Sequence, residues 1–165
     1  MIAKTSIFQN LKRLNNLYNK SKNVKQSLFF SKLAILELCG WIEESMDDIV
    51  HRFSMRNLRD ASNKNYVENF IIKRTYGFEY DRHFREMLIS LIGIIYVEKL
   101  ERKVNRTKFQ NLKGTLESLK TYRDMEAHTH IKGITKRLDA PSAIISKFFI
   151  IYDGLKDFEE NLKKA

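Results

Sequence analysis

Apolar residues recur every three or four positions along most of the chain, and no stretch alternates apolar and polar residues long enough to indicate a β-strand. The first series, over residues 7–17, predicts a helix that ends between residues 19 and 23. A longer series predicts a second helix over residues 27–53. The pattern therefore predicts an all-α fold, a helical bundle of about five to six helices.

The middle of the chain is less regular. Residues 54–65 are rich in Asn, Asp and Ser, which predicts a loop before a short helix over residues 66–74. A break is expected around Gly77. Asp81 then has the side chain of a helix cap, and the apolar residues up to Leu100 predict a helix that begins near Arg82 and lies at the centre of the protein.

Two further helices are expected towards the C-terminus. Asn105 or Thr107 suits the start of the first, whose apolar row contains Phe109, Leu112, Leu116 and Leu119. Arg123 is the next member of that row, so its guanidinium should point at a neighbouring surface and meet an acidic group there. Pro141 suits the first turn of the last helix, which is predicted to begin within residues 139–142.

Composition narrows the possible partners. A chain of 165 residues with 43% hydrophobic and 30% charged residues is expected to form a single domain over residues 1–165. The net charge of +10 favours contact with a polyanion, most simply nucleic acid, although any single Lys is more often just a solvated surface residue. Five acidic residues within residues 37–48 predict an acidic face on the second helix.

The cysteine count, the N-terminal residues and the most apolar stretch bear on where in the cell the protein is expected. Cys39 is the sole cysteine, so we expect a core thiol, no disulfide framework and a reducing cytoplasm. The N-terminal residues lack the pattern of a signal peptide. The most apolar stretch, Met87 to Val97, is shorter than the roughly 20 residues that cross a bilayer, which predicts a buried helix and no membrane contact.

Residues 119–130 contain an arginine and a histidine five positions apart, Arg123 and His128, with Asp124 after the arginine and Ala127 before the histidine. This spacing resembles the R-x4-6-H signature of HEPN-domain ribonucleases, and the wider match is to the RiboL-PSP-like branch of that family. The resemblance implies a HEPN-like helical domain that cleaves RNA without a metal or other cofactor.

The residue types suit that reaction. Histidine titrates near neutral pH and can act as acid or base, and arginine offers fixed, forked donors to phosphate oxygens. On a continuous helix, however, the two side chains would lie about 140° apart. Either the helix loosens near Ala127, or a second subunit supplies the matching groups, and the resemblance implies a homodimer with a composite cleft. His130 also satisfies the looser spacing, but Ala127 favours His128.

Supporting roles follow from the resemblance and from charge. Asp124 takes the polar position that is commonly Asn in the family, where it would orient Arg123 or contact substrate. Lys120, Lys132 and the lysines of residues 4–32 would hold the RNA backbone. A carboxylate of an earlier helix, Glu37 or Glu43, could orient the histidine, although such a residue is more often a solvated surface group. Some family members carry a tyrosine two residues after the histidine that a partner antitoxin modifies; here His130 stands there.

Other interpretations stay open. Arg123 can pair with Glu126 or Glu37 while His128 only ends its helix. The chain would then be a non-catalytic RNA-binding or partner-binding module, or an α-helical dimer whose acidic residues 37–48 dock a basic partner. The leading hypothesis remains a cytoplasmic endoribonuclease of prokaryotic defence, stress response or a toxin-antitoxin system, with an antitoxin or defence protein as possible partner.

Overall fold

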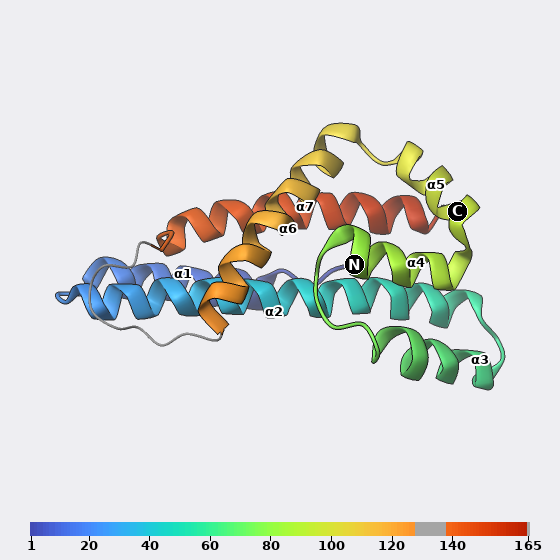
Figure 1. Ribbon diagram of the computed structural model, residues 1–165, viewed down its shortest axis with the longest axis horizontal. Coiled ribbons are helices and arrows are strands. Elements are labelled where there is room, and N and C mark those ends of the chain that lie inside the picture. The colour runs from blue at the N-terminus through green and yellow to red at the C-terminus, as the bar shows by residue number, and fades with distance from the viewer. Residues whose placement is uncertain (128–137, 165) are drawn as a thin grey trace.

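The computed structural model describes residues 1–127 and 138–164, which are helical with no β-strand (Figure 1). The predicted all-α fold is confirmed, with seven α-helices in this part of the chain instead of five to six. The helices are α1 (Thr5–Lys20), α2 (Val24–Asn57), α3 (Ala61–Tyr66), α4 (Arg85–Ile92), α5 (Ile94–Lys103), α6 (Arg106–Ala127) and α7 (Pro141–Leu162). Two π-helical segments, η1 (Val67–Ile72) and η2 (Tyr80–Phe84), precede the loop around Gly77 and α4, respectively.

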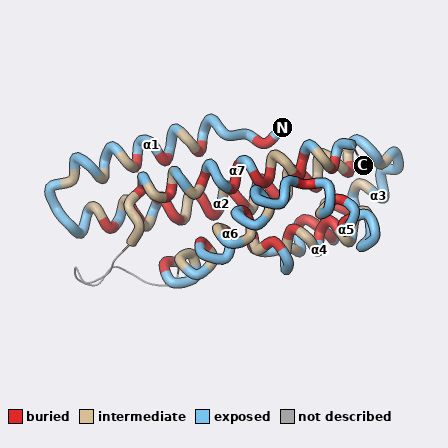
Figure 2. Tube along the Cα trace, turned by 90° about the horizontal axis from the view of Figure 1, so that it is seen from above, coloured by how far each residue is buried: buried red, intermediate tan, exposed pale blue. Residues whose placement is uncertain are grey.

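The 34-residue helix α2 is the axis of the molecule, with α1 and α7 packed along it (Figure 1). Asn23 caps α2 by accepting a hydrogen bond from the Lys25 N–H at 2.8 Å. One side of α2 is fully buried through Ile35, Leu38 and Ile42. In Figure 2 the buried positions of α2 and α7 lie on the sides that face neighbouring helices. Apolar residues that recur every three or four positions therefore form the core.

Helix α6 crosses α7 and α2 obliquely (Figure 1). The Asn105 side chain accepts a hydrogen bond from the Lys108 N–H at 3.0 Å, which confirms a start at Asn105. The predicted row is buried, with Leu112, Leu116 and Leu119 at 0% exposure. The crossing is close because α7 carries Gly154 there: a Cβ on that glycine would lie 2.8 Å from Leu112 Cβ.

The predicted continuous, central helix from Arg82 to Leu100 is wrong. Gly93, with φ +80°, ends α4 and turns the chain into α5. As a result Ile94 and Ile95 are 57% and 66% exposed, although their sequence is the most apolar of the chain. No helix in residues 1–127 or 138–164 combines the length and apolarity needed to cross a membrane.

Two further expectations in this region are also wrong. Asp81 does not cap a helix; η2 begins before it, at Tyr80, and the Asp81 carboxylate pairs with Lys113 of α6 at 2.7 Å. Residues 54–65 are mostly helical, because α2 continues to Asn57 and Asp60 caps α3 by accepting from the Ser62 N–H at 2.8 Å. Asn, Asp and Ser side chains are common both in loops and at the first residues of helices, so a polar cluster does not by itself distinguish the two.

A nearly buried carboxylate ties the far end of α7 to the rest of the bundle. The Glu159 side chain is 5% exposed and accepts a hydrogen bond from the Ile2 N–H at 3.1 Å. Its Oε1 lies 2.9 Å from Lys163 Nζ, 3.0 Å from the Met1 amino nitrogen and 3.5 Å from Arg52 Nε. Burial by itself would raise the pKa of Glu159, but these cations outweigh it and lower the pKa to about 2.

The close crossing of α6 and α7 gives a stability prediction. Gly154→Ala should lower the free energy of unfolding by about 1 to 3 kcal/mol, because the added methyl group overlaps the Leu112 Cβ, which cannot rotate away. Gly114→Ala is the matched control: it lies inside α6 with nothing within 4 Å, so the change should be neutral or stabilising. Urea unfolding of both variants checks this, and equal stability of the two would contradict the close crossing.

Candidate functional site

Arg123 lies one turn before the end of α6, beyond the buried leucine row. Since Leu116 and Leu119 are fully buried against the bundle, the same side of the helix brings Arg123 to the edge of the core instead of into solvent. Its side chain is 32% exposed. The helix crossing therefore presents a partly exposed guanidinium five residues before His128 in the chain.

Carboxylates and an aromatic ring hold this guanidinium. Arg123 Nη1 lies 3.7 Å from Glu43 Oε1 of α2, and Arg123 Nε lies 3.1 Å from Asp124 Oδ1. The guanidinium carbon is 5.4 Å from the centre of the buried Phe78 ring. The expected acidic neighbour is thus present. The closest contacts of these two ion pairs are made by Nη1 and Nε, respectively.

The other predicted site residues are distributed differently. Lys120 Nζ pairs with Asp124 Oδ2 at 3.2 Å, so Asp124 bridges the two basic side chains. Glu37 is not next to Arg123; its carboxylate accepts a hydrogen bond from Asn10 Nδ2 of α1 at 3.3 Å. The α2 carboxylate that meets Arg123 is that of Glu43, six residues later. His128, His130 and Lys132 lie outside the described residues.

Cys39, on the same helix, is a core thiol as predicted. It is 3% exposed. Burial raises the pKa of the Cys39 thiol to about 12, although the positive charge of Arg123 acts in the opposite direction. The thiol is therefore protonated at neutral pH and is not a nucleophile for this site.

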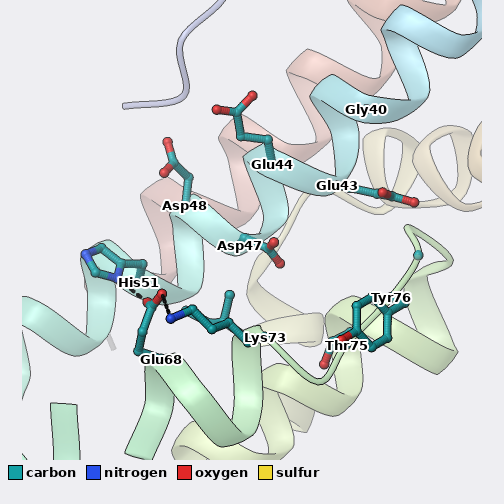
Figure 3. A pocket seen from close by; sticks show the side chains of 12 residues that line it. Gly40, Glu43, Glu44, Asp47, Asp48, His51, Glu68, Lys73, Thr75 and Tyr76 are labelled. Carbon is teal, nitrogen blue, oxygen red and sulfur yellow. Dashed lines mark hydrogen bonds and ion pairs between the residues drawn. The ribbon is translucent and has the colours of Figure 1, made fainter. Parts of the chain in front are cut away.

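A large acidic groove begins where Glu43 meets Arg123. Its volume is about 850 Å³, and one wall is the stripe of α2 that contains Gly40, Glu43, Glu44, Asp47, Asp48 and His51. Their spacing of three and four residues places them along one side of the helix. The opposite wall is η1 and the loop after it, through Glu68, Ile72, Lys73, Thr75, Tyr76 and Gly77. In Figure 3, Glu43 and Asp47 project towards the loop.

Negative charge dominates this groove and changes the chemistry of Asp47. Burial and then the neighbouring carboxylates of Glu43, Asp48, Glu68 and Glu44 raise the pKa of Asp47 to about 6. Glu68 is partly neutralised, since its Oε2 lies 3.2 Å from His51 Nδ1 and its Oε1 lies 3.5 Å from Lys73 Nζ (Figure 3). Asp47 can therefore take up a proton close to neutral pH.

The groove and the place of Asp47 in it were not predicted from the sequence. The sequence predicts one acidic cluster over residues 37–48, whereas in the structure Glu37 lies beside α1, apart from the carboxylates that line the groove. The spacing Glu43, Asp47, His51 was the available signal, because steps of four place three titratable groups in line on a helix. The opposite wall, with Glu68, comes from a segment whose approach only the fold determines.

The groove's loop depends on Gly77, whose φ is +132°. A Cβ at this position would lie 2.6 Å from the ring of His83, and His83 in turn accepts a hydrogen bond from the Glu79 N–H at 3.1 Å. The predicted break around Gly77 is confirmed. His83 has a structural role here, because its contacts hold the loop that carries Tyr76 and Phe78.

No group of three His, Cys, Asp or Glu side chains within residues 1–127 and 138–164 is arranged to hold a metal ion. Comparison with known proteins leaves the family open: no family model matches the chain, and no curated protein and no solved structure matches it either. Function must therefore be argued from the residues of the site.

The raised pKa of Asp47 predicts that replacing this residue stabilises the protein by an amount that depends on pH. Because its folded pKa of about 6 lies above the ordinary 3.8, ionisation costs stability increasingly from pH 3.8 to 6 and fully above pH 6. Asp47→Asn should therefore raise the free energy of unfolding by about 1 to 2 kcal/mol at pH 7.5, after allowance for partial exposure, and change it little at pH 3.8.

Urea unfolding at both pH values measures this effect. Asp48→Asn is the control on the same helix: it removes the 2.6 Å ion pair with Arg52 and should give no gain at pH 7.5. An Asp47→Asn protein that is less stable than the parent at pH 7.5 would refute the account.

Proposed function

We propose that this protein is a metal-independent endoribonuclease of HEPN type, in which Arg123 stabilises the scissile phosphate and His128 transfers a proton. The observation that carries the proposal is the position of Arg123: its guanidinium contacts Glu43 and Phe78 and is partly exposed near the end of α6, five residues before the histidine of the R-x4-H spacing. A preoriented cation of this kind is what a developing phosphorane requires.

The reaction needs few groups. A base removes the proton from the ribose 2′-hydroxyl, the 2′-oxygen attacks phosphorus, and the bond to the 5′-oxygen breaks as that oxygen gains a proton. The products are a 2′,3′-cyclic phosphate and a 5′-hydroxyl. Arg123 would contact a non-bridging phosphate oxygen through its guanidinium, while the net charge of +10 attracts the substrate.

One histidine cannot easily serve both proton transfers in one step, so we propose that two copies of the chain place their Arg123 and His128 around one cleft. The Asp124 carboxylate, which contacts both Arg123 and Lys120, would keep the guanidinium in place between turnovers. The setting we propose is cytoplasmic, in a prokaryotic defence, stress-response or toxin-antitoxin system with a protein that restrains the activity.

The acidic groove favours a second candidate function. Five carboxylates line it, and they repel RNA but suit a basic protein segment. Together with the ion pairs that Arg123 makes with Glu43 and Asp124, this supports a non-catalytic module that docks a basic partner. Weak, salt-insensitive association with RNA would favour this candidate.

Cleavage of mixed RNA in EDTA tests the leading proposal. Arg123→Ala and His128→Ala should each lower the rate by at least about 100-fold while secondary structure and oligomeric state persist. His130→Ala separates the two candidate histidines and should retain activity. Arg102→Ala, which removes an exposed arginine of α5, is the charge-matched control and should cleave as the parent does. Parent activity that is absent, or products with a 3′-hydroxyl, would reject the proposal.

Binding of a 12-residue Lys/Arg-rich peptide tests the second candidate. If the groove docks basic segments, Glu44→Lys should weaken peptide binding by at least about tenfold, because it puts like charge in the groove. Glu37→Lys makes the same charge change on the same helix outside the groove and should bind as the parent does. Fluorescence anisotropy at two salt concentrations measures both, and equal loss in the two variants would show only a net-charge effect.

A further inference from the structure

An exposed row of stacked side chains runs along α3 and η1. Tyr66 and Phe70 are 58% and 49% exposed, and their rings stack with centres 5.2 Å apart and planes 14° apart. The guanidinium carbon of Arg74, four residues further on, lies 4.4 Å from the centre of the Phe70 ring. We call Tyr66, Phe70 and Arg74 the stacked row. Figure 1 shows α3 and the segment after it at the outer edge of the molecule.

The core does not account for this row. The same segment contributes Val67, Ile71 and Ile72 to the core, each 7% exposed or less, and these residues alone provide its buried side. Tyr66 and Phe70 instead expose about half of two large apolar side chains to water. Apolar side chains that gather on a surface, unlike singly scattered ones, are a mark of an interaction site.

The charged residues around the stacked row indicate which kind of ligand it would bind. Residues 56–74 contain five basic side chains and two acidic ones, Asp60 and Glu68. Both carboxylates are engaged: Asp60 caps α3, and Glu68 faces the acidic groove, where it pairs with His51 and Lys73. Arg74 is exposed and has no ion pair with a carboxylate in the described part of the chain. The row is therefore aromatic and cationic, on a different side of η1 from the groove.

We infer that the stacked row is a binding platform for single-stranded RNA. A base stacks on the face of the Tyr66 ring that points away from Phe70 and so adds one more layer to the stack. Arg74 contacts the adjacent phosphate. Stacking of this kind accepts any base and requires an unpaired strand, because the bases of a duplex expose only their edges. The platform would be a second substrate-binding surface of the proposed ribonuclease. The choice of RNA as its ligand rests on that proposed function.

Anisotropy with a fluorescent 12-nucleotide 2′-O-methyl oligoadenylate tests the platform. The methyl group blocks the proposed cleavage, so binding is measured whether or not the protein is a nuclease. Tyr66→Ala and Phe70→Ala should each weaken binding by about 5- to 100-fold, the range of one lost base–aromatic stack. Tyr66→Phe and Phe70→Tyr keep the rings and should bind as the parent does.

Two controls separate stacking from charge and from general loss of aromatic surface. Tyr76→Ala removes a tyrosine that is 82% exposed but lies at the acidic groove, and should leave binding unchanged. The slope of log affinity against log salt should be unchanged in Phe70→Ala and shallower by about one in Arg74→Gln, since only the latter removes a phosphate contact. Circular dichroism melting confirms that these surface variants fold.

Specific outcomes would overturn the platform. Parent-like affinity of Tyr66→Ala and Phe70→Ala would do so, as would equal losses for the single strand and for a 12-base-pair duplex. A change in self-association on sedimentation with RNA affinity intact would instead identify the row as a protein contact. Loss of binding in both alanine variants, combined with a parent that cleaves no RNA, would retain the platform and reject only the nuclease.

Discussion

The crossing of α6 over α7 and α2 is the constraint on which the candidate site depends. Leu112, Leu116 and Leu119 are fully buried along it, and Gly154 removes the side chain that would hold the helices apart. Since a packed core tolerates little displacement, the end of α6 has one position relative to α2. That position brings Arg123 within ion-pair distance of Glu43, a residue 80 positions earlier in the chain.

Charge is separated across η1. Its inner side, with Glu68, closes an acidic groove against α2, and its outer side carries the stacked aromatic and arginine side chains. The two surfaces suit opposite ligands, because carboxylates repel phosphate whereas aromatic rings and guanidinium groups bind bases and phosphates. Arg123 lies at the boundary of the groove, where a phosphate would compete for its guanidinium with the two carboxylates that also fix its orientation.

Periodicity was a reliable guide where a helix packs along its length. The burial of Ile42, Met46 and Ile49 of α2, the cap of α6 at Asn105 and the start of α7 at Pro141 agree with the apolar pattern and the capping residues. Nearer the start of α2 the agreement fails, since Phe29 and Leu33 are 50% and 45% exposed. Prediction failed at Gly93 and Asp81. A single glycine within an apolar stretch does not reveal whether its φ is positive, and an aspartate near a helix start serves equally as a cap or as the partner of a distant lysine.

The sequence by itself determined the all-α fold, the position of Arg123 at the end of a buried row and the need for an acidic neighbour, because these follow from the helical repeat and from the cost of burying a charge. Only the tertiary structure decided that Glu43 and not Glu37 meets Arg123, that Asp47 lies in a groove that raises its pKa, and that Tyr66 and Phe70 remain exposed. Helical periodicity assigns a residue to a side of its own helix, whereas the neighbour of that side depends on how distant segments pack.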